Sequence, residues 1–301
     1  MPASRRTLAR LALMLGCLSA ALAGHVAPAS AQEKVGLPSL DTDSHGAPVM
    51  IDAYLFRPAD ASGPTPAVVF MHGCNGMFTR KGKIDARELD WARRFNAQGY
   101  AVLAVDSFSS RGQGSECTGG GAVRPSVERA RDAYGALRYL QRLPGIRADR
   151  VALMGWSHGG GTVLFSVGPG SPARAQGADT SAPDFAAAVA FYPGWCNVKA
   201  QGANWSTRIP LLVLTGADDV WTKAAPCEAF MKDITANGVP VDFHVYPGAV
   251  HDFDYPNLPR RERPEFTNPR THVVPITGTQ PEAREDAIAR VTAFLSKTLG
   301  S

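Results

Sequence analysis

The stretch VALMGWSHGGG, residues 151–161, is the part of the chain that decides the fold. Residues 151–154 are all apolar, which is typical of a short buried strand. They lead into a G-x-S-x-G motif at residues 155–159, and the residues after it favour the start of a helix. A serine between a strand and a helix sits on a sharp turn that exposes its hydroxyl above the sheet. Ser157 is therefore a candidate nucleophile.

Outside this stretch the chain alternates short apolar runs with amphipathic helical patterns. That alternation predicts an α/β fold, in which helices cover both faces of a mostly parallel sheet. No internal repeat and no domain-sized linker is present, so we expect one domain over residues 32–301. Residues 32–46 and 254–280 lack clear periodicity and are expected to be irregular. The expected strands are residues 49–56, 66–71, 101–105, 151–154, 185–191, 210–214 and 241–246, and the expected helices are residues 86–98, 125–143, 224–237 and 281–299.

A serine nucleophile needs a histidine base that a carboxylate orients. In this strand order the three residues are expected in the order Ser, Asp, His. Asp219 follows a predicted strand downstream of Ser157, and His251 lies in the loop after the last strand. Asp218 competes with Asp219 for the acid. We favour Asp219 because it lies three residues after Gly216, in a G-x-x-D turn.

The tetrahedral intermediate of acyl transfer needs backbone N–H groups that stabilise its oxyanion. The N–H of His158, directly after the serine, is one expected donor. The other is expected in the loop HGCNG, residues 72–76, and Cys74 is the candidate. The glycines of this loop also suit an ordinary tight turn.

The beginning of the chain has the pattern of a bacterial export signal. Residues 4–10 carry three arginines, residues 11–24 are apolar but too short to span a bilayer, and an A-x-A-like site precedes Gln32. We expect residues 1–31 to be removed and the protein to reach the periplasm or the medium. The arginine pair at positions 5 and 6 fits a twin-arginine signal and an ordinary secretory signal equally well.

The charge balance gives no indication of a nucleic-acid or membrane partner. The formal net charge is +4, but the expected leader takes three arginines and no acidic residue with it. The mature chain is then close to neutral, and no second apolar run is long enough to span a membrane.

Four cysteines follow the expected leader, and no C-x-x-C pattern of a zinc site occurs. An even number of cysteines in an exported protein suggests two disulfides, for which three connectivities exist. We favour Cys74–Cys117 and Cys196–Cys227, because the strand order brings each pair to one sheet edge.

Four motifs occur in order along the chain: HGC at residues 72–74, GWSHG at 155–159, GADD at 216–219 and YPGAVHDF at 246–253. Taken together, they resemble the α/β-hydrolase superfamily and, more closely, the dienelactone hydrolase-like family, over most of residues 48–299. The resemblance implies an α/β-hydrolase fold and hydrolysis of a small ester or lactone without a metal or organic cofactor.

The chain also departs from dienelactone hydrolase proper, which uses a cysteine nucleophile and a glutamate near the oxyanion loop. Here the nucleophile is Ser157, and residues 72–75 contain no glutamate. Arginines hold the substrate carboxylate in that enzyme, and Arg111 is similarly placed, although it equally suits a surface loop. These differences favour a serine esterase over the family's namesake reaction.

Several aromatic residues fall near the expected cleft. We expect them either to shape the substrate pocket or to pack in the core, the core being the better expectation for at least two of them. They are Trp156, Tyr192, Trp195 and Trp221.

Three other functions remain open at the level of sequence. A peptidase or amidase would use the same triad, although no propeller or cap domain is apparent. A non-catalytic binding protein would keep the fold, but no triad residue is missing. A third alternative is an exported enzyme that acts on a polymeric ester, which would require a shallow cleft.

Overall fold

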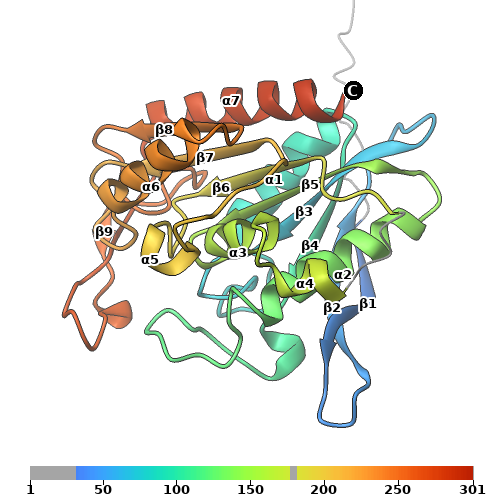
Figure 1. Cartoon of the computed structure of the whole chain (residues 1–301), viewed down its shortest axis with the longest axis horizontal. Coiled ribbons are helices and arrows are strands. Elements are labelled where there is room, and N and C mark those ends of the chain that lie inside the picture. Colours follow the sequence, from blue (N-terminus) through green and yellow to red (C-terminus); the bar gives the residue numbers. More distant parts are fainter. Residues whose placement is uncertain (1–31, 177–181, 301) are drawn as a thin grey trace, which may run out of the picture.

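The fold is organised around one eight-stranded sheet, which the computed structural model describes together with its helices over residues 32–176 and 182–300 (Figure 1). The expected leader, residues 1–31, lies outside the described residues. The strand order is β1-β2-β4-β3-β5-β6-β7-β8, and every pair from β4 to β8 is parallel. The strands are β1 (Gln32–Thr42), β2 (Pro48–Phe56), β3 (Thr65–Met71), β4 (Ala101–Asp106), β5 (Ile146–Trp156), β6 (Ala187–Phe191), β7 (Leu211–Gly216) and β8 (Val241–Tyr246).

Helices cover both faces of this sheet, as the alternating pattern predicts. Alternate residues of a strand point to opposite faces, so Val69 packs on one side of β3 and Phe70 on the other. Helices α2, α3 and α6 contribute to the core on the first face, and α1 and α7 to the core on the second. The helices are α1 (Ala86–Ala97), α2 (Glu128–Arg142), α3 (His158–Val167), α4 (Pro172–Gln176), α5 (Val198–Gln201), α6 (Ala224–Ala236) and α7 (Pro281–Leu299).

The predicted α/β class is confirmed, and most predicted elements agree with the observed ones to within a few residues. One expectation was wrong: residues 32–42, expected to be irregular, form β1. This strand pairs antiparallel with β2, from Gln32 opposite Phe56 to Pro38 opposite Met50. It lies at the edge of the sheet with one face exposed, so its sequence carries only a weak apolar pattern.

The second expected irregular region, residues 254–280, is largely irregular. It contains only the two-residue strands β9 (Arg261–Glu262) and β10 (Ile276–Thr277) and the short 3-10 turn η2 (Pro264–Phe266). Within the described part of the chain, no helix has the length and apolar character needed to cross a membrane.

The turn from β5 into α3 requires glycine because three backbone segments meet there. A Cβ atom on Gly159 would lie 1.9 Å from the carbonyl oxygen of Met71, the last residue of β3. A Cβ on Gly155 would lie 2.3 Å from the carbonyl oxygen of Gly159. The two motif glycines thus allow the start of α3 to pack directly on the ends of β3 and β5.

We expect Gly159→Ala to lower the free energy of unfolding by about 3 kcal/mol, because the backbone it would displace belongs to the central sheet. Urea denaturation of the two proteins measures this difference. Gly63→Ala is the control, since that position has open space around it, and it should stay within about 1 kcal/mol of the parent. Equal stability of the two variants would contradict the close approach.

Candidate active site

Ser157 lies on the turn between β5 and α3 with a backbone conformation that few residues adopt. Its φ is 55° and its ψ −110°, a strained region for a residue with a Cβ. Three backbone hydrogen bonds hold the turn: Ser157 N–H donates to Phe191 O, and the N–H groups of Gly161 and Gly194 donate to Ser157 O, each at 2.9 Å. These hydrogen bonds to neighbouring backbone groups therefore hold the serine in a conformation that its own backbone preference disfavours.

His251 and Asp219 form a buried pair near this turn. His251 Nδ1 lies 2.7 Å from Asp219 Oδ2, and both side chains are almost completely buried. The N–H groups of Trp221 and Thr222 donate to Asp219 Oδ1 at 2.8 and 2.9 Å, and the Thr222 hydroxyl donates to Oδ2 at 2.8 Å. Asp218 is exposed. The geometry thus pairs the histidine with the aspartate that sequence reasoning favoured.

The surroundings of His251 act on its pKa in opposite directions. Burial lowers the pKa, whereas the charge and the hydrogen bond of Asp219 raise it, and the net effect is a pKa above the ordinary value. The rings of Tyr192 and Trp221 lie 4.5 and 4.8 Å from the imidazole ring, centre to centre. The imidazole is therefore held by aromatic rings as well as by the aspartate.

Two adjoining pockets meet at Ser157. One has a volume of about 380 Å³ and the other of about 720 Å³, and both are lined by Ser157, Cys74, Cys117 and Trp221. Only the larger one also reaches His251. The smaller pocket is further lined by Glu116, Gly119, His158, Pro193, Gly194, Trp195, Cys196, Asn197, Thr222, Lys223, Pro226 and Asn268.

Both expected disulfides are present, and both border the smaller pocket. Cys74 is bonded to Cys117 and Cys196 to Cys227. The first bond attaches residues 109–123 to the loop after β3, and Glu116 N–H donates to Cys74 O at 2.8 Å. Three of the four cysteines line the pocket, so the disulfides fix two of its walls.

The two expected oxyanion donors lie on either side of the serine. His158 is the first residue of α3, so its N–H has no carbonyl partner within the helix. Cys74 belongs to the loop after β3 and lines both pockets with Ser157. The structure therefore brings both segments to the same place, as the motif context predicts.

Arg129, in helix α2, connects these two segments and was not found by sequence reasoning. The guanidinium is fully buried; Nη1 lies 2.6 Å from His158 Nδ1, and Nη2 donates to His72 O at 2.7 Å. Burial lowers the pKa of Arg129 to about 10, and burial together with Arg129 keeps the pKa of His158 well below its usual range. In the sequence, this arginine is simply a charged residue within a helical pattern.

Of the four aromatic residues expected near the cleft, two line a pocket and two do not. Trp221 lines both pockets and Trp195 the smaller one. Trp156 and Tyr192 are fully buried behind His251, where Trp156 Nε1 and the Tyr192 hydroxyl donate to Asp254. Their expected substrate role is corrected to packing, because the core takes up their rings and Asp254 their polar atoms.

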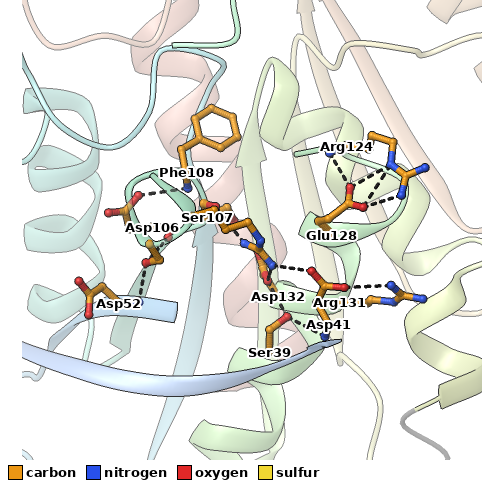
Figure 2. Close-up of polar contacts among 12 residues, drawn as sticks. Ser39, Asp41, Asp52, Asp106, Ser107, Phe108, Arg124, Glu128, Arg131 and Asp132 are labelled. Atoms are coloured by element: carbon orange, nitrogen blue, oxygen red, sulfur yellow. Dashed lines mark hydrogen bonds and ion pairs between the residues drawn. The ribbon is translucent and has the colours of Figure 1, made fainter. Parts of the chain in front are cut away.

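Arg111 is also away from both pockets. It ends the 3-10 turn η1 (Ser109–Arg111) and donates to both carboxylate oxygens of Asp132 at 2.8 Å and to Asp41 at 3.2 Å. Asp41 also accepts a hydrogen bond from Arg131, and Figure 2 shows Asp41, Arg131 and Asp132 close together where β1 meets α2. The structure therefore does not bring Arg111 to the candidate site; its charge is neutralised by carboxylates that attach β1 to α2.

Metal-binding clusters of three or more His, Cys, Asp or Glu side chains were not found among residues 32–176 and 182–300. A sequence model of the dienelactone hydrolase family matches residues 51–299. The chain belongs to this family.

Solved structures share the fold of this family member. A dienelactone hydrolase-like promiscuous phosphotriesterase from metagenomic libraries has a TM-score of 0.60 at 21% identity, covering 90% of this chain and 100% of the other. Esterase 2 of Thermogutta terrifontis has a TM-score of 0.58 at 14% identity, covering 91% and 96%. At these identities the likeness shows the fold alone.

Curated relatives differ in length and in the bonds they cleave. Dipeptidyl aminopeptidase BIII of Pseudoxanthomonas mexicana is 26% identical over 221 residues, which is 65% of this chain but only 31% of that protein. A "Probable 2-oxo-3-(5-oxofuran-2-ylidene)propanoate lactonase" of Bradyrhizobium is 24% identical over 74% of this chain and 86% of its own length. The chain thus spans about a third of the first relative and most of the second.

Replacing Arg129 by methionine should lower the free energy of unfolding by about 3 kcal/mol, because His72 O and His158 Nδ1 would stay buried without a donor. Urea denaturation at neutral pH measures the change. Arg93→Met is the control, since the Arg93 side chain is 71% exposed and its ion pair with Asp90 should contribute less than about 1 kcal/mol. Similar losses in the two variants would show that the buried contacts of Arg129 add no stability.

Proposed function

We propose that this member of the dienelactone hydrolase family is an exported serine hydrolase that cleaves carboxylic esters or lactones. The observation that carries the proposal is the buried His251–Asp219 pair, because its histidine lines a pocket together with a serine on a strained strand-to-helix turn. A histidine oriented by a carboxylate is the base that a serine nucleophile needs.

In the proposed mechanism His251 takes the proton of Ser157 as the hydroxyl oxygen attacks the carbonyl carbon. Asp219 engages Nδ1 of the imidazole, which leaves Nε2 as the nitrogen that accepts the proton. The N–H groups of Cys74 and His158 stabilise the oxyanion. The alcohol leaves with the proton from His251, and an acyl-enzyme forms. A water molecule activated by His251 then releases the acid and restores the serine.

Export is part of the proposal. The leader pattern of residues 1–31 supports it, and so do the two disulfides, which persist in oxidising compartments such as the periplasm. An ester or lactone substrate is supported by the family and by the relative described as a lactonase, of whose length the match covers 86%.

The proposal predicts that a fluorophosphonate probe labels the mature protein and that Ser157→Ala abolishes the labelling. The same variant should lose at least about a thousandfold in kcat/KM on p-nitrophenyl esters, because the nucleophile is gone. Mass spectrometry of the labelled protein and initial rates measure the two effects. The matched control is Ser110→Ala, whose hydroxyl only bonds to the backbone near β4. Labelling that survives Ser157→Ala would refute a serine enzyme.

A second candidate function is hydrolysis of amides, which the similarity to a dipeptidyl aminopeptidase favours. The same side chains serve both reactions, so only substrates distinguish them. A p-nitroanilide with the same acyl group as the best p-nitrophenyl ester provides the comparison. Faster turnover of the anilide would favour the peptidase.

The acid of the triad can be tested by charge removal at two neighbouring positions. Asp219→Asn should lower kcat by about 10⁴, as loss of a triad aspartate does, because the imidazole loses its orienting partner. Asp218→Asn should leave kcat within about twofold, because Asp218 is exposed and only its backbone is held, by Ala249 O. The reverse order of effects would assign the acid to Asp218.

The same pair of variants has a signature in the pH profile. Only neutral His251 accepts a proton, so kcat/KM should fall as the pH drops through the pKa of this histidine, at a pH above the ordinary value of about 6.5. In Asp219→Asn this acid limb should move to lower pH, because the charge of Asp219, which opposes the effect of burial on the pKa of His251, is gone. In Asp218→Asn it should stay in place. An acid limb of kcat/KM that stays at the same pH in Asp219→Asn would contradict the role of His251 as the base.

A further inference from the structure

The smaller pocket beside Ser157 contains a carboxylate that the proposed mechanism does not use. Glu116 lines this pocket together with the serine, although its side chain is 95% buried. Sequence reasoning found no glutamate in the loop after β3; this one comes from residues 109–123, which the Cys74–Cys117 disulfide attaches to that loop. A buried carboxylate next to a nucleophile requires an explanation, because taking a charge out of water is costly.

Only one of the two oxygen atoms of Glu116 has a hydrogen-bond partner among the described residues. Oε1 accepts from Val123 N–H at 3.0 Å, which holds the end of the loop. Oε2 has no such partner within hydrogen-bond distance. The ring nitrogen Nε2 of His158 lies 3.7 Å from it, which is too far for a hydrogen bond. Holding the loop therefore accounts for one oxygen and leaves the other without a hydrogen bond, in a residue that lines the pocket.

His158 does not neutralise this carboxylate. Arg129 is always a donor, so His158 Nδ1 accepts its hydrogen bond and the imidazole carries its single proton on Nε2. Burial and the neighbouring arginine keep the imidazole neutral. Arg129 acts on Glu116 and on Asp132 through its charge, but among the described residues it makes no hydrogen bond to either carboxylate.

The remaining walls of the pocket are mostly uncharged. They include three disulfide cysteines, Trp195 and Trp221, which offer polarisable and aromatic surface. The other charged side chain is Lys223, which is exposed and precedes helix α6, so water screens its charge. A partly desolvated carboxylate with aromatic neighbours is a setting that favours a cation.

We propose that the smaller pocket is a subsite for a positively charged group on the substrate, with Glu116 as the residue that selects it. The proposal rests on the serine hydrolase function proposed above and narrows it to esters whose acyl chain carries an ammonium or quaternary ammonium group. Glu116 touches the substrate through Oε2, and Trp195 and Trp221 contact the same group with their rings. This substrate class has the opposite charge to the carboxylate-bearing lactone of the namesake enzyme.

Two esters of equal shape test the charge directly. The p-nitrophenyl esters of 4-(trimethylammonio)butanoate and 5,5-dimethylhexanoate differ only in a quaternary nitrogen and a quaternary carbon. The mature wild-type protein should show a higher kcat/KM for the cationic ester, by about tenfold or more. In Glu116→Gln the ratio of the two values should fall about tenfold, because the amide keeps the shape and removes the charge.

Glu228→Gln is the matched control. Glu228 lies on α6, is exposed and does not line the pocket, so the substitution changes the net charge by the same amount. Its ratio should equal that of the wild type. Because each ratio compares two substrates of one protein, a general loss of activity in Glu116→Gln cancels.

The outcomes separate the two proposals. Hydrolysis of both esters that survives Ser157→Ala would overturn the serine mechanism. With that mechanism intact, a wild-type ratio near one would overturn the cationic subsite, even if Glu116→Gln failed to fold. The cationic subsite would also be overturned if the preference for the cationic ester persisted in Glu116→Gln. The same holds if Glu228→Gln abolished this preference to the same extent.

Discussion

The constraint on which the rest of the structure depends is the contact between the start of α3 and the ends of β3 and β5. Only a residue without a Cβ fits at position 159, because a Cβ on Gly159 would lie 1.9 Å from Met71 O. This contact forces Ser157 into a strained conformation and places its hydroxyl above the sheet. It also brings the loop after β3, which contains Cys74, beside the helix start. One close backbone contact therefore positions both the serine and the segments that carry the expected oxyanion donors.

Three charged side chains near this contact are almost completely buried, and they differ in how well their polar atoms are hydrogen-bonded. Asp219 is buried, and His251, Thr222 and two backbone N–H groups hold its carboxylate in place. Arg129 is equally buried and connects His72 with His158. Glu116 is the exception, since only one of its oxygen atoms has a hydrogen bond among the described residues, and the residue lines a pocket. A buried charge that the protein itself does not satisfy is more easily explained by a substrate than by stability.

The fold and the order of the chemical residues could be predicted from local signals. Apolar runs mark the parallel strands, and the G-x-S-x-G turn with later Asp and His residues marks the site, because parallel strands end at one edge of the sheet. Strand β1 could not be predicted, because an edge strand with one exposed face has little apolar periodicity. Arg111 and Tyr192 were candidate substrate-binding residues that the structure places outside the pockets, for a related reason. Position after a strand shows the edge of the sheet but not whether a side chain turns toward the pocket or into the core.

By itself, the sequence determined the α/β class, the strained serine turn, the disulfide pairs favoured by strand order and membership of a hydrolase family. Each depends on neighbours along the chain or on the common edge of a parallel sheet. Only the tertiary structure decided which aspartate meets His251, that Arg129 bridges two loops, and that Glu116 faces the smaller pocket. These contacts join residues far apart in sequence, and whether a polar group is satisfied or left free depends on packing that no local pattern encodes.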